Sequence, residues 1–319
     1  MRQSFPIIQS LLQEKAEYQA RLNLIPYDGT PEVKENKSGK YLYIRKRING
    51  KLTSTYVDIF SDELYQVLLR NSKEARELRK HIRRIDKELA LNGYVEEELT
   101  AEVIINLDFA RANMKSSIYD QAVLEGVATT FPQTEEILDN GTVNGMTADD
   151  VQKILNLKHA WEFILDKDVI RAESNYHLLC HVAKLVNEGF YYDGGRIRGI
   201  PVMIGGTDYI PPIPIESQVS EQIEDILNSG KEPIDIAIGL CMYCMRTQVF
   251  VDGNKRASVI FANHYMIAHG LGLIVIPEDS VSEFKKILVE YYETADISEV
   301  SRFLKDKCWR KIKLNIKQP

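Results

Sequence analysis

The sequence predicts a mainly helical protein with a small β-rich module near its amino terminus. Three observations lead to this fold class: helical apolar spacing over most of the chain after Thr100, two β-rich runs that meet at an Asn-Gly dipeptide, and one later stretch of glycines and prolines that departs from the helical pattern. A chain of 319 residues is long enough for two domains. We therefore expect a helical bundle with a protruding β-hairpin, preceded by a hairpin and helix module.

Composition narrows the class of protein. Apolar residues make up 44% of the chain and charged residues 27%, which is typical of soluble globular proteins. Gln and Ser interrupt the first apolar residues, and nowhere do eighteen uncharged apolar residues follow one another. We expect neither a signal peptide nor a membrane-spanning helix, and we place the protein in the cytoplasm with no membrane partner.

The amino-terminal part begins with a β-hairpin and continues into a helix. Residues 41–48 and 51–57 are β-rich, and Asn49-Gly50 between them suits a type I′ turn. Ser61 can cap the helix that follows, which a second Asn-Gly pair ends. We expect a helical leader over residues 1–37 and a basic hairpin and helix module over residues 38–95.

This module carries much of the positive charge. The net charge is −6, yet residues 34–87 hold 15 Lys/Arg against 7 Asp/Glu. Together with Tyr41, Tyr43 and Tyr56 on the hairpin, these charges have the composition of a nucleic-acid contact. Charged helix faces of mixed sign are more often simply solvated. We expect a packing or partner-docking role, with nucleic-acid binding kept as the alternative.

Helical spacing dominates the rest of the chain. We expect a helical domain over residues 100–305 and a carboxy-terminal tail over residues 306–319. The predicted helices cover residues 101–120, 147–165, 174–187, 216–227, 234–247, 254–269 and 281–294. Residues 191–212 break the pattern, because a short apolar β run lies between glycines and a double proline there. This stretch predicts a protruding strand or hairpin.

A tight loop between two helices contains the candidate binding residues. Gly253 allows close approach of the backbone, and the start of the following helix presents free N–H groups to an anion. Lys255 and Arg256 add positive charge, while Asp252 can hold the Mg²⁺ that accompanies a nucleotide. An ordinary turn before a basic helix would have the same spacing. The loop therefore suits polyphosphate but does not establish it.

The same run resembles the motif of the Fic/Doc family, H-x-F-x-D-G-N-G/K-R. Five positions match: Phe250, Asp252, Gly253, Asn254 and Arg256. The resemblance implies an all-α Fic-type bundle in which Gly253, Asn254, Lys255 and Arg256 bind the phosphates of ATP or another nucleotide, and Asp252 holds Mg²⁺.

The resemblance extends to two other segments. The run after Arg198 is similar to the family's flap, so Val202, Met203, Ile204 and Gly205 would align the target as an added strand. The pair Glu125-Gly126 is similar to the family's inhibitory element, so we expect Glu125 to be either inhibitory or a structural carboxylate at a helix end.

Three residues depart from the family pattern. Gln248 stands where the catalytic histidine is expected, and a carboxamide has no usable pKa for a general base. Lys255 replaces a glycine and matches the death-on-curing branch, for which the resemblance implies phosphate transfer. Val259 replaces the second arginine, so Glu125 could reach only Lys255 or Arg256. Gln121 stands where self-inhibited members carry Ser or Thr.

Other candidate residues suit structural roles better. Cys241 and Cys244 form a C-x-x-C among apolar neighbours, which favours buried helix cysteines over a metal site. His177 and His181 lie one helical turn apart, but no further ligands complete a zinc site in the sequence pattern.

The resemblance implies a transferase that moves AMP or phosphate from a nucleotide to a hydroxyl of an unidentified protein substrate. Gln248 predicts reduced or altered activity, so whether the chain is an enzyme stays open at this point. The alternative is a non-catalytic interaction protein that keeps the fold. Members of the family often dimerise, so a homodimer is also an expectation.

Overall fold

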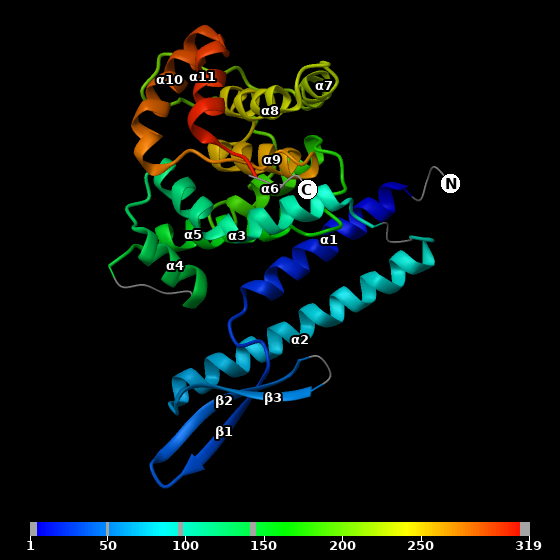
Figure 1. Cartoon of the computed structure of the whole chain (residues 1–319), viewed down its shortest axis with the longest axis vertical. Helices are drawn as coiled ribbons and strands as arrows, with labels where there is room; N and C mark the ends of the chain where they lie inside the picture. The colour runs from blue at the N-terminus through cyan, green and yellow to red at the C-terminus, as the bar shows by residue number, and fades with distance from the viewer. Residues whose placement is uncertain (1–4, 49–50, 95–97, 141–144, 313–319) are drawn as a thin grey trace, which may run out of the picture. The chain divides into compact units, whose positions relative to one another are not determined.

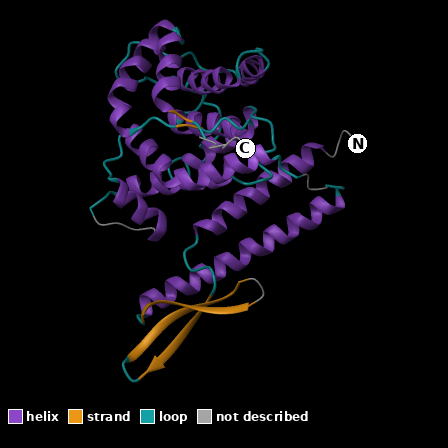
Figure 2. Ribbon diagram, in the orientation of Figure 1, coloured by secondary structure: helices purple, strands orange, loops and turns teal. Residues whose placement is uncertain are grey.

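The computed structural model describes residues 5–48, 51–94, 98–140 and 145–312, and the chain divides into two compact units, Met1–Glu97 and Glu98–Pro319. Helices dominate the described residues, and their strands form a small amino-terminal sheet and a short two-stranded antiparallel sheet near the carboxy terminus (Figure 2). The predicted fold class, mainly helical with a small amino-terminal β module, is confirmed.

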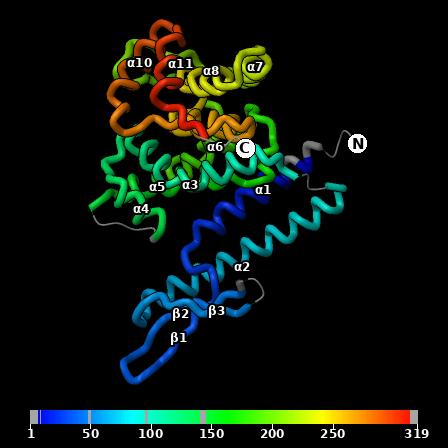
Figure 3. Tube along the Cα trace, viewed as in Figure 1, coloured from blue at the N-terminus to red at the C-terminus, as the bar shows by residue number. Residues whose placement is uncertain are grey.

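The first unit consists of a three-stranded antiparallel sheet and two helices. Figure 3 traces the chain through α1 (Phe5–Leu24), the strands β1 (Thr30–Asn36), β2 (Gly39–Ile48) and β3 (Lys51–Ile59), and then the long helix α2 (Asp62–Leu91). The sequence predicted two strands, and the structure adds β1, which lies inside the range expected to be a helical leader. Pro31 and the charged residues of β1 weakened the strand signal there. The predicted turn at Asn49-Gly50 lies outside the described residues.

One face of this sheet packs on α2. Leu42 and Ile44 alternate along β2 and are buried against Leu68 of α2. Ser61 caps α2 as predicted, since its side chain accepts a hydrogen bond of 3.2 Å from the Leu64 N–H. The sheet and α2 therefore share one small hydrophobic core.

The second unit is a bundle of helices. Each helix predicted after Thr100 is present, with ends shifted by a few residues. Figure 1 labels its helices, and the elements follow in chain order: α3 (Ala101–Leu124), α4 (Phe131–Asn140), α5 (Ala148–Ile164), α6 (Tyr176–Val186), α7 (Glu216–Leu227), α8 (Pro233–Thr247), α9 (Asn254–Ala268), β4 (Leu273–Ile274), α10 (Val281–Thr294), α11 (Ser298–Phe303) and β5 (Trp309–Arg310).

Helix α9 forms the centre of this bundle. It contacts α3, α5, α6 and α8, and nearly all of its residues are buried. Aromatic side chains such as Trp161, Phe163 and Phe261 are fully buried in the same unit. The first turn of α9 is therefore held from several sides, which fixes the position of the loop before it.

The structure corrects the prediction of a flap hairpin. Residues 201–215 are described, yet they contain no strand and consist of irregular segments and turns between α6 and α7. Glycines at 205 and 206 and the double proline at 211–212 favour this irregular course over a paired ladder. The described strands of this unit, β4 and β5, form a short antiparallel pair elsewhere. In the described part of the chain, no helix is long and apolar enough to cross a membrane.

Candidate functional site

The loop between α8 and α9 is shaped by two residues in the left-handed region. Gln248 ends α8 with φ 49° and ψ 62°, and Gly253 begins α9 with φ 73°. These two turns reverse the chain within six residues, between helices that are both largely buried. The predicted arrangement of helix, tight loop and helix is confirmed.

Gly253 is required by its surroundings as well as by its backbone angle. A Cβ atom added there would lie 2.6 Å from Asn187 Oδ1. Asn187 Nδ2 in turn donates hydrogen bonds of 3.0 Å to the carbonyls of Gly194 and Asp252. Sequence reasoning missed Asn187, because an asparagine at the end of a helix, here α6, has the pattern of an ordinary cap.

Asn254 closes the loop from inside. Its Nδ2 donates to the Phe250 carbonyl at 2.8 Å, and its Oδ1 accepts from the Phe250 N–H at 2.9 Å. The side chain is only 5% exposed. Asn254 was predicted to bind phosphate, but its amide is used to hold the loop, so only its backbone N–H is placed to meet an anion.

The Gln248 side chain is also turned into the loop. Its Nε2 donates to the Met245 carbonyl at 2.6 Å, and its Oε1 accepts from Asn254 Nδ2 at 3.0 Å. Both ends of the carboxamide therefore take part in internal hydrogen bonds. In this position Gln248 stabilises the end of α8 and the loop together.

Arg198 joins the flap to the loop. Its guanidinium is 2% exposed and donates to the carbonyls of Gln248, Ile200 and Pro212 at 2.5, 2.7 and 2.6 Å. Its own N–H donates to the Val249 carbonyl at 3.0 Å, and burial lowers the pKa of Arg198. Both ends of the flap are thus fastened to the motif loop. The sequence signal for Arg198 was only its place beside the flap.

Arg256 is a buried cation in the first turn of α9. Its side chain is 3% exposed, Nη1 donates to the Val186 carbonyl at 2.8 Å, and Nη2 lies 3.1 Å from Asp252 Oδ2. Burying a guanidinium is costly unless its donors are satisfied. Within the described residues, however, the buried Arg256 Nε has no hydrogen-bond partner.

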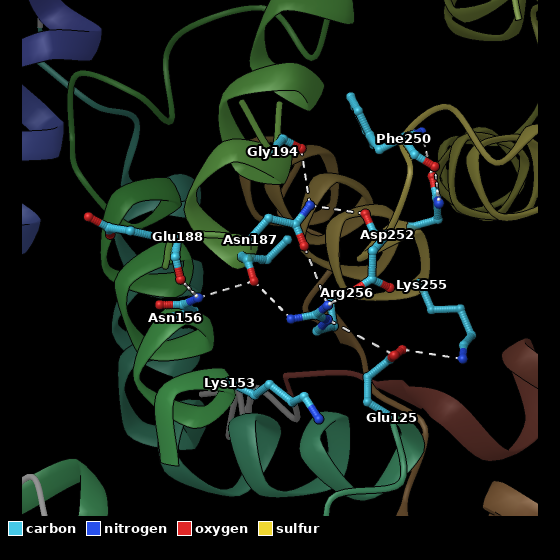
Figure 4. A network of polar contacts seen from close by, with 12 residues as sticks. Glu125, Lys153, Asn156, Asn187, Glu188, Gly194, Phe250, Asp252, Lys255 and Arg256 are labelled. Atoms are coloured by element: carbon cyan, nitrogen blue, oxygen red, sulfur yellow. Dashed lines mark hydrogen bonds and ion pairs between the residues drawn. The ribbon is translucent and has the colours of Figure 1, made fainter. Parts of the chain in front are cut away.

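Glu125 faces this cation and its neighbour. It lies at the end of α3, with Oε1 3.6 Å from Lys255 Nζ and Oε2 4.0 Å from Arg256 Nε (Figure 4). The predicted approach of Glu125 to Lys255 or Arg256 is confirmed. Both distances are longer than a good charge-assisted hydrogen bond, and Glu125 Oε1 has no hydrogen-bond partner among the described residues.

Gln121 supports the same turn from α3. Its Nε2 donates to the Arg256 carbonyl at 2.8 Å, while its Oε1 accepts from Trp161 Nε1 at 3.1 Å. All three groups are buried. A long carboxamide is needed to span this gap, which gives Gln121 a structural role at the site.

The site can accept a phosphate group at the start of α9. Gly253 has no side chain with which to cap the helix, and the described chain shows no side-chain hydrogen bond to that cap. The first N–H groups of α9 and the positive end of its dipole lie beside Lys255 and Arg256. A phosphate oxygen would also supply the missing partner of Arg256 Nε.

Asp252 is placed for a metal ion that a ligand shares. Its side chain is 51% exposed, and only Oδ2 contacts Arg256. The described residues contain no cluster of three or more His, Cys, Asp or Glu that could hold a metal alone. Mg²⁺ is commonly held by one or two carboxylates and the phosphates of a nucleotide, which is the pattern that Asp252 fits.

The flap residues lie on an open part of the same unit. Met203 is 89% exposed, Gly205 is exposed, and Val202 and Ile204 are half-buried. Within the described chain no strand pairs with this segment. An added strand would find a backbone edge there.

The remaining candidates have structural surroundings. Cys241 and Cys244 are buried in α8, as predicted, and burial raises the pKa of Cys241 to about 12. The ring of His181 stacks on Phe163 with 4.4 Å between centroids. Neither pair adds to the loop described above.

The second unit has the Fic fold. Residues 174–266, which contain the flap, α8, the loop and most of α9, match the family described as Fic/DOC. Residues 6–66 of the first unit match a domain of unknown function, DUF6788. The chain therefore contains two segments, one in each unit, that are similar to different families.

Several proteins are similar to this chain. "Protein adenylyltransferase Fic" of Drosophila willistoni is 27% identical over 205 residues, which covers 59% of this chain and 39% of that protein. The protein of the same name from Drosophila melanogaster is 28% identical over the same length, with the same coverage of the two chains. The match thus spans about two fifths of the length of these relatives.

Solved structures show the same fold. Fic-1 (residues 134–508) from C. elegans superposes with a TM-score of 0.52 and 17% identity, over 76% of this chain and 80% of that one. A Fic family protein from Desulfovibrio desulfuricans G20 gives 0.52 and 15%, over 66% and 73%. Because both identities are low, these structures establish the fold alone.

Proposed function

We propose that the second unit is a nucleotide-binding Fic-type transferase that moves AMP, or phosphate, from a nucleotide to a hydroxyl of a target protein. One observation carries this proposal: the buried Arg256 and the half-buried Lys255 converge with Glu125 at the uncapped start of α9. The similarity to proteins named as adenylyltransferases supports AMP as the transferred group.

In this proposal the backbone of α9 binds the phosphates. The N–H groups after Gly253 donate to the phosphate oxygens, and Lys255 and Arg256 neutralise their charge. Asn254 keeps the loop in shape through its contacts with Phe250. The Glu125 carboxylate lies beside Lys255 and Arg256, where a phosphate would bind. Glu125 therefore competes with phosphate for these two cations.

Asp252 would hold the Mg²⁺ of a nucleotide such as ATP. A bound Mg²⁺ supplies charge neutralisation to the transferring group. The half-exposed carboxylate lies one residue before Gly253, so its free oxygen is available beside the start of α9. Arg256 fixes the other oxygen and thereby the orientation of the side chain.

The reaction type depends on Lys255. The family resemblance associates a lysine at this position with the branch that transfers phosphate, whereas the named relatives transfer AMP. Lys255 reaches Glu125 at 3.6 Å and is only about one third exposed. Its ammonium group is thus placed to contact whichever phosphate lies closest to α3.

Gln248 limits the chemical step. Loss of a positioned general base costs about 10²–10⁴ in rate, and both ends of the Gln248 carboxamide are engaged in the loop. Transfer to a hydroxyl has a loose transition state in which positioning and charge neutralisation dominate. We therefore propose slow transfer with the flap, Val202 to Gly205, aligning the target.

A second candidate function follows from the same residue. Because the Gln248 side chain is bound inside the loop, the fold can also serve as a non-catalytic module that holds a nucleotide or a partner. Both functions predict nucleotide binding, and they differ in whether the loop supports group transfer.

Restoring histidine distinguishes the two. Histidine tolerates the left-handed region, and one ring nitrogen can replace the contact with Asn254 while the other faces a hydroxyl. We expect Gln248→His to raise labelling of protein hydroxyls from MgATP by about 10²-fold or more. Intact-mass spectrometry of the protein and of candidate targets measures this, and the product mass separates AMP from phosphate.

The control is Gln248→Asn, which keeps a carboxamide and supplies no base. Equal labelling by Gln248→His and Gln248→Asn, with both variants folded and binding nucleotide, would favour the non-catalytic module.

A further inference from the structure

The first unit contains a basic cleft between β2 and α2. The cavity has a volume of about 350 Å³, and six cationic side chains line it. These are Arg45, Lys46 and Arg47 on β2, and Arg76, Arg79 and Arg83 on α2. The cleft lies in the first unit, outside residues 174–266 that match the Fic/DOC family.

The positive charge of this cleft is only partly neutralised. Among the residues that the structure describes, Asp28 is the one carboxylate that lines it. Asp28 contacts Lys46 Nζ at 2.8 Å and also pairs with Arg79. The exposed Arg76 and Arg83 lie on the same wall as Arg79, so the cleft keeps an excess of positive charge.

The cations are spread along a line. Arg76 and Arg83 are seven residues apart on one helix with Arg79 between them, which corresponds to about 10 Å along its axis. A binding site for a single phosphate would gather its donors around one point. A row of this length fits successive phosphates of a chain.

Aromatic side chains lie on the other face of the same sheet, because Leu42 and Ile44 of β2 face α2. Tyr43, Arg45 and Arg47 alternate along β2 and therefore share one face of the sheet. Tyr56 pairs with Tyr43 across the strands, with ring centroids 5.6 Å apart, and is 49% exposed. These rings therefore lie across the sheet from the arginines of α2, and the cations that line the cleft supply its contacts to phosphate.

We propose that this cleft binds the phosphodiester backbone of a nucleic acid through its row of cations. The local excess of Lys/Arg over residues 34–87 supports the same ligand. This site is separate from the nucleotide site of the second unit, and it adds a nucleic-acid partner to the proposed transferase.

Fluorescence anisotropy with the full chain tests the proposal. The probes are a labelled 20-nucleotide single strand and a 20-base-pair duplex, each titrated from about 50 to 200 mM salt, the range over which phosphate contacts change affinity strongly. Arg76→Gln combined with Arg83→Gln removes two cations but leaves Arg79 on Asp28. The matched control, Lys73→Gln with Lys80→Gln, removes two exposed cations of α2 outside the cleft.

We expect the wild-type chain to bind at least one probe. The probe that binds more tightly shows whether the ligand is single-stranded or duplex nucleic acid. The cleft variant should weaken binding by about tenfold and flatten the salt dependence by about one unit of slope per lost phosphate contact. Arg45→Gln with Arg47→Gln, on the opposite wall, should have the same effect. The control pair should change little.

Three results would overturn the proposal. The wild-type chain could bind neither probe at low salt, or the cleft and control variants could weaken binding equally. Alternatively, inorganic tripolyphosphate could compete as well as the oligonucleotide at equal phosphate concentration, which would identify a general polyanion surface. Thermal unfolding of each variant establishes that the loss of binding is local.

Discussion

At the scale of single residues, the site is held by side chains that donate hydrogen bonds to the backbone of the loop. Asn187 supports the backbone of the loop, Asn254 closes it, and Arg198 fastens the flap to it. These contacts position the N–H groups and cations at the start of α9. The residues predicted to bind therefore depend on residues that serve only as supports.

Gly253→Ala tests this support directly. The substitution forces a Cβ into the left-handed region and places it 2.6 Å from Asn187 Oδ1. We expect a loss of about 1–3 kcal/mol in the free energy of unfolding, measured by urea denaturation. Gly199→Ala is the matched control, because an added Cβ meets nothing within 4 Å there. Equal losses for both variants would mean that the loop does not need its glycine.

The sequence predicted the loop residues better than their roles. Gly253, Arg256 and Glu125 lie where the motif and the helix-end pattern placed them. Asn254 was assigned to phosphate, but its amide holds the loop. Asn187 and Arg198 were missed as supports, since their partners are backbone carbonyls distant in the sequence, which no local pattern reveals.

At the scale of elements, α9 connects the site to the core. His264, nearly three turns after the loop end of the helix, is fully buried between Ser174 and the Val169 carbonyl, at 2.8 and 2.9 Å. Burial lowers the pKa of His264 to about 4. The neutral imidazole is thus part of the packing around α9.

This burial predicts a dependence of stability on pH. In the unfolded chain the histidine pKa is about 6.5, so the unfolded state takes up a proton first as pH falls. The contribution of His264 is complete above pH 6.5 and is lost progressively down to about pH 4, by an amount on the order of 3 kcal/mol. His264→Gln should remove this part of the slope, measured by urea denaturation at pH 7.5, 6, 5 and 4.5. An unchanged slope in the variant would show that other groups cause it.

Helices were predicted well and strands poorly. Long apolar periodicity marks α3 and α5 to α10, and capping residues such as Ser61 and Thr147 place helix starts, whereas the short helices α4 and α11 were not predicted. The expected flap hairpin is instead an irregular loop, since its course is set by the buried Arg198 and not by a strand partner. The strand β1 was missed because its residues are mostly charged and exposed. In both segments the backbone conformation depends on contacts with residues distant in the sequence.

At the scale of the whole molecule, the chain combines two units of opposite charge character. The basic first unit is matched by an acidic remainder, since the net charge is −6. In our proposals the first unit holds a nucleic-acid backbone and the second unit binds a nucleotide. Both sites use cations against phosphate, but only the second places them at a helix start beside a carboxylate.

The central claim is that the loop between α8 and α9 binds a nucleotide. Isothermal titration calorimetry of the full chain with ATP, GTP and CTP, each with and without Mg²⁺, tests it most directly. We predict binding of at least one nucleotide, strengthened by Mg²⁺ through Asp252 and strengthened again in Glu125→Gly, which frees Lys255 and Arg256. Absence of binding to every nucleotide, by both the wild-type chain and a folded Glu125→Gly variant, would contradict the account.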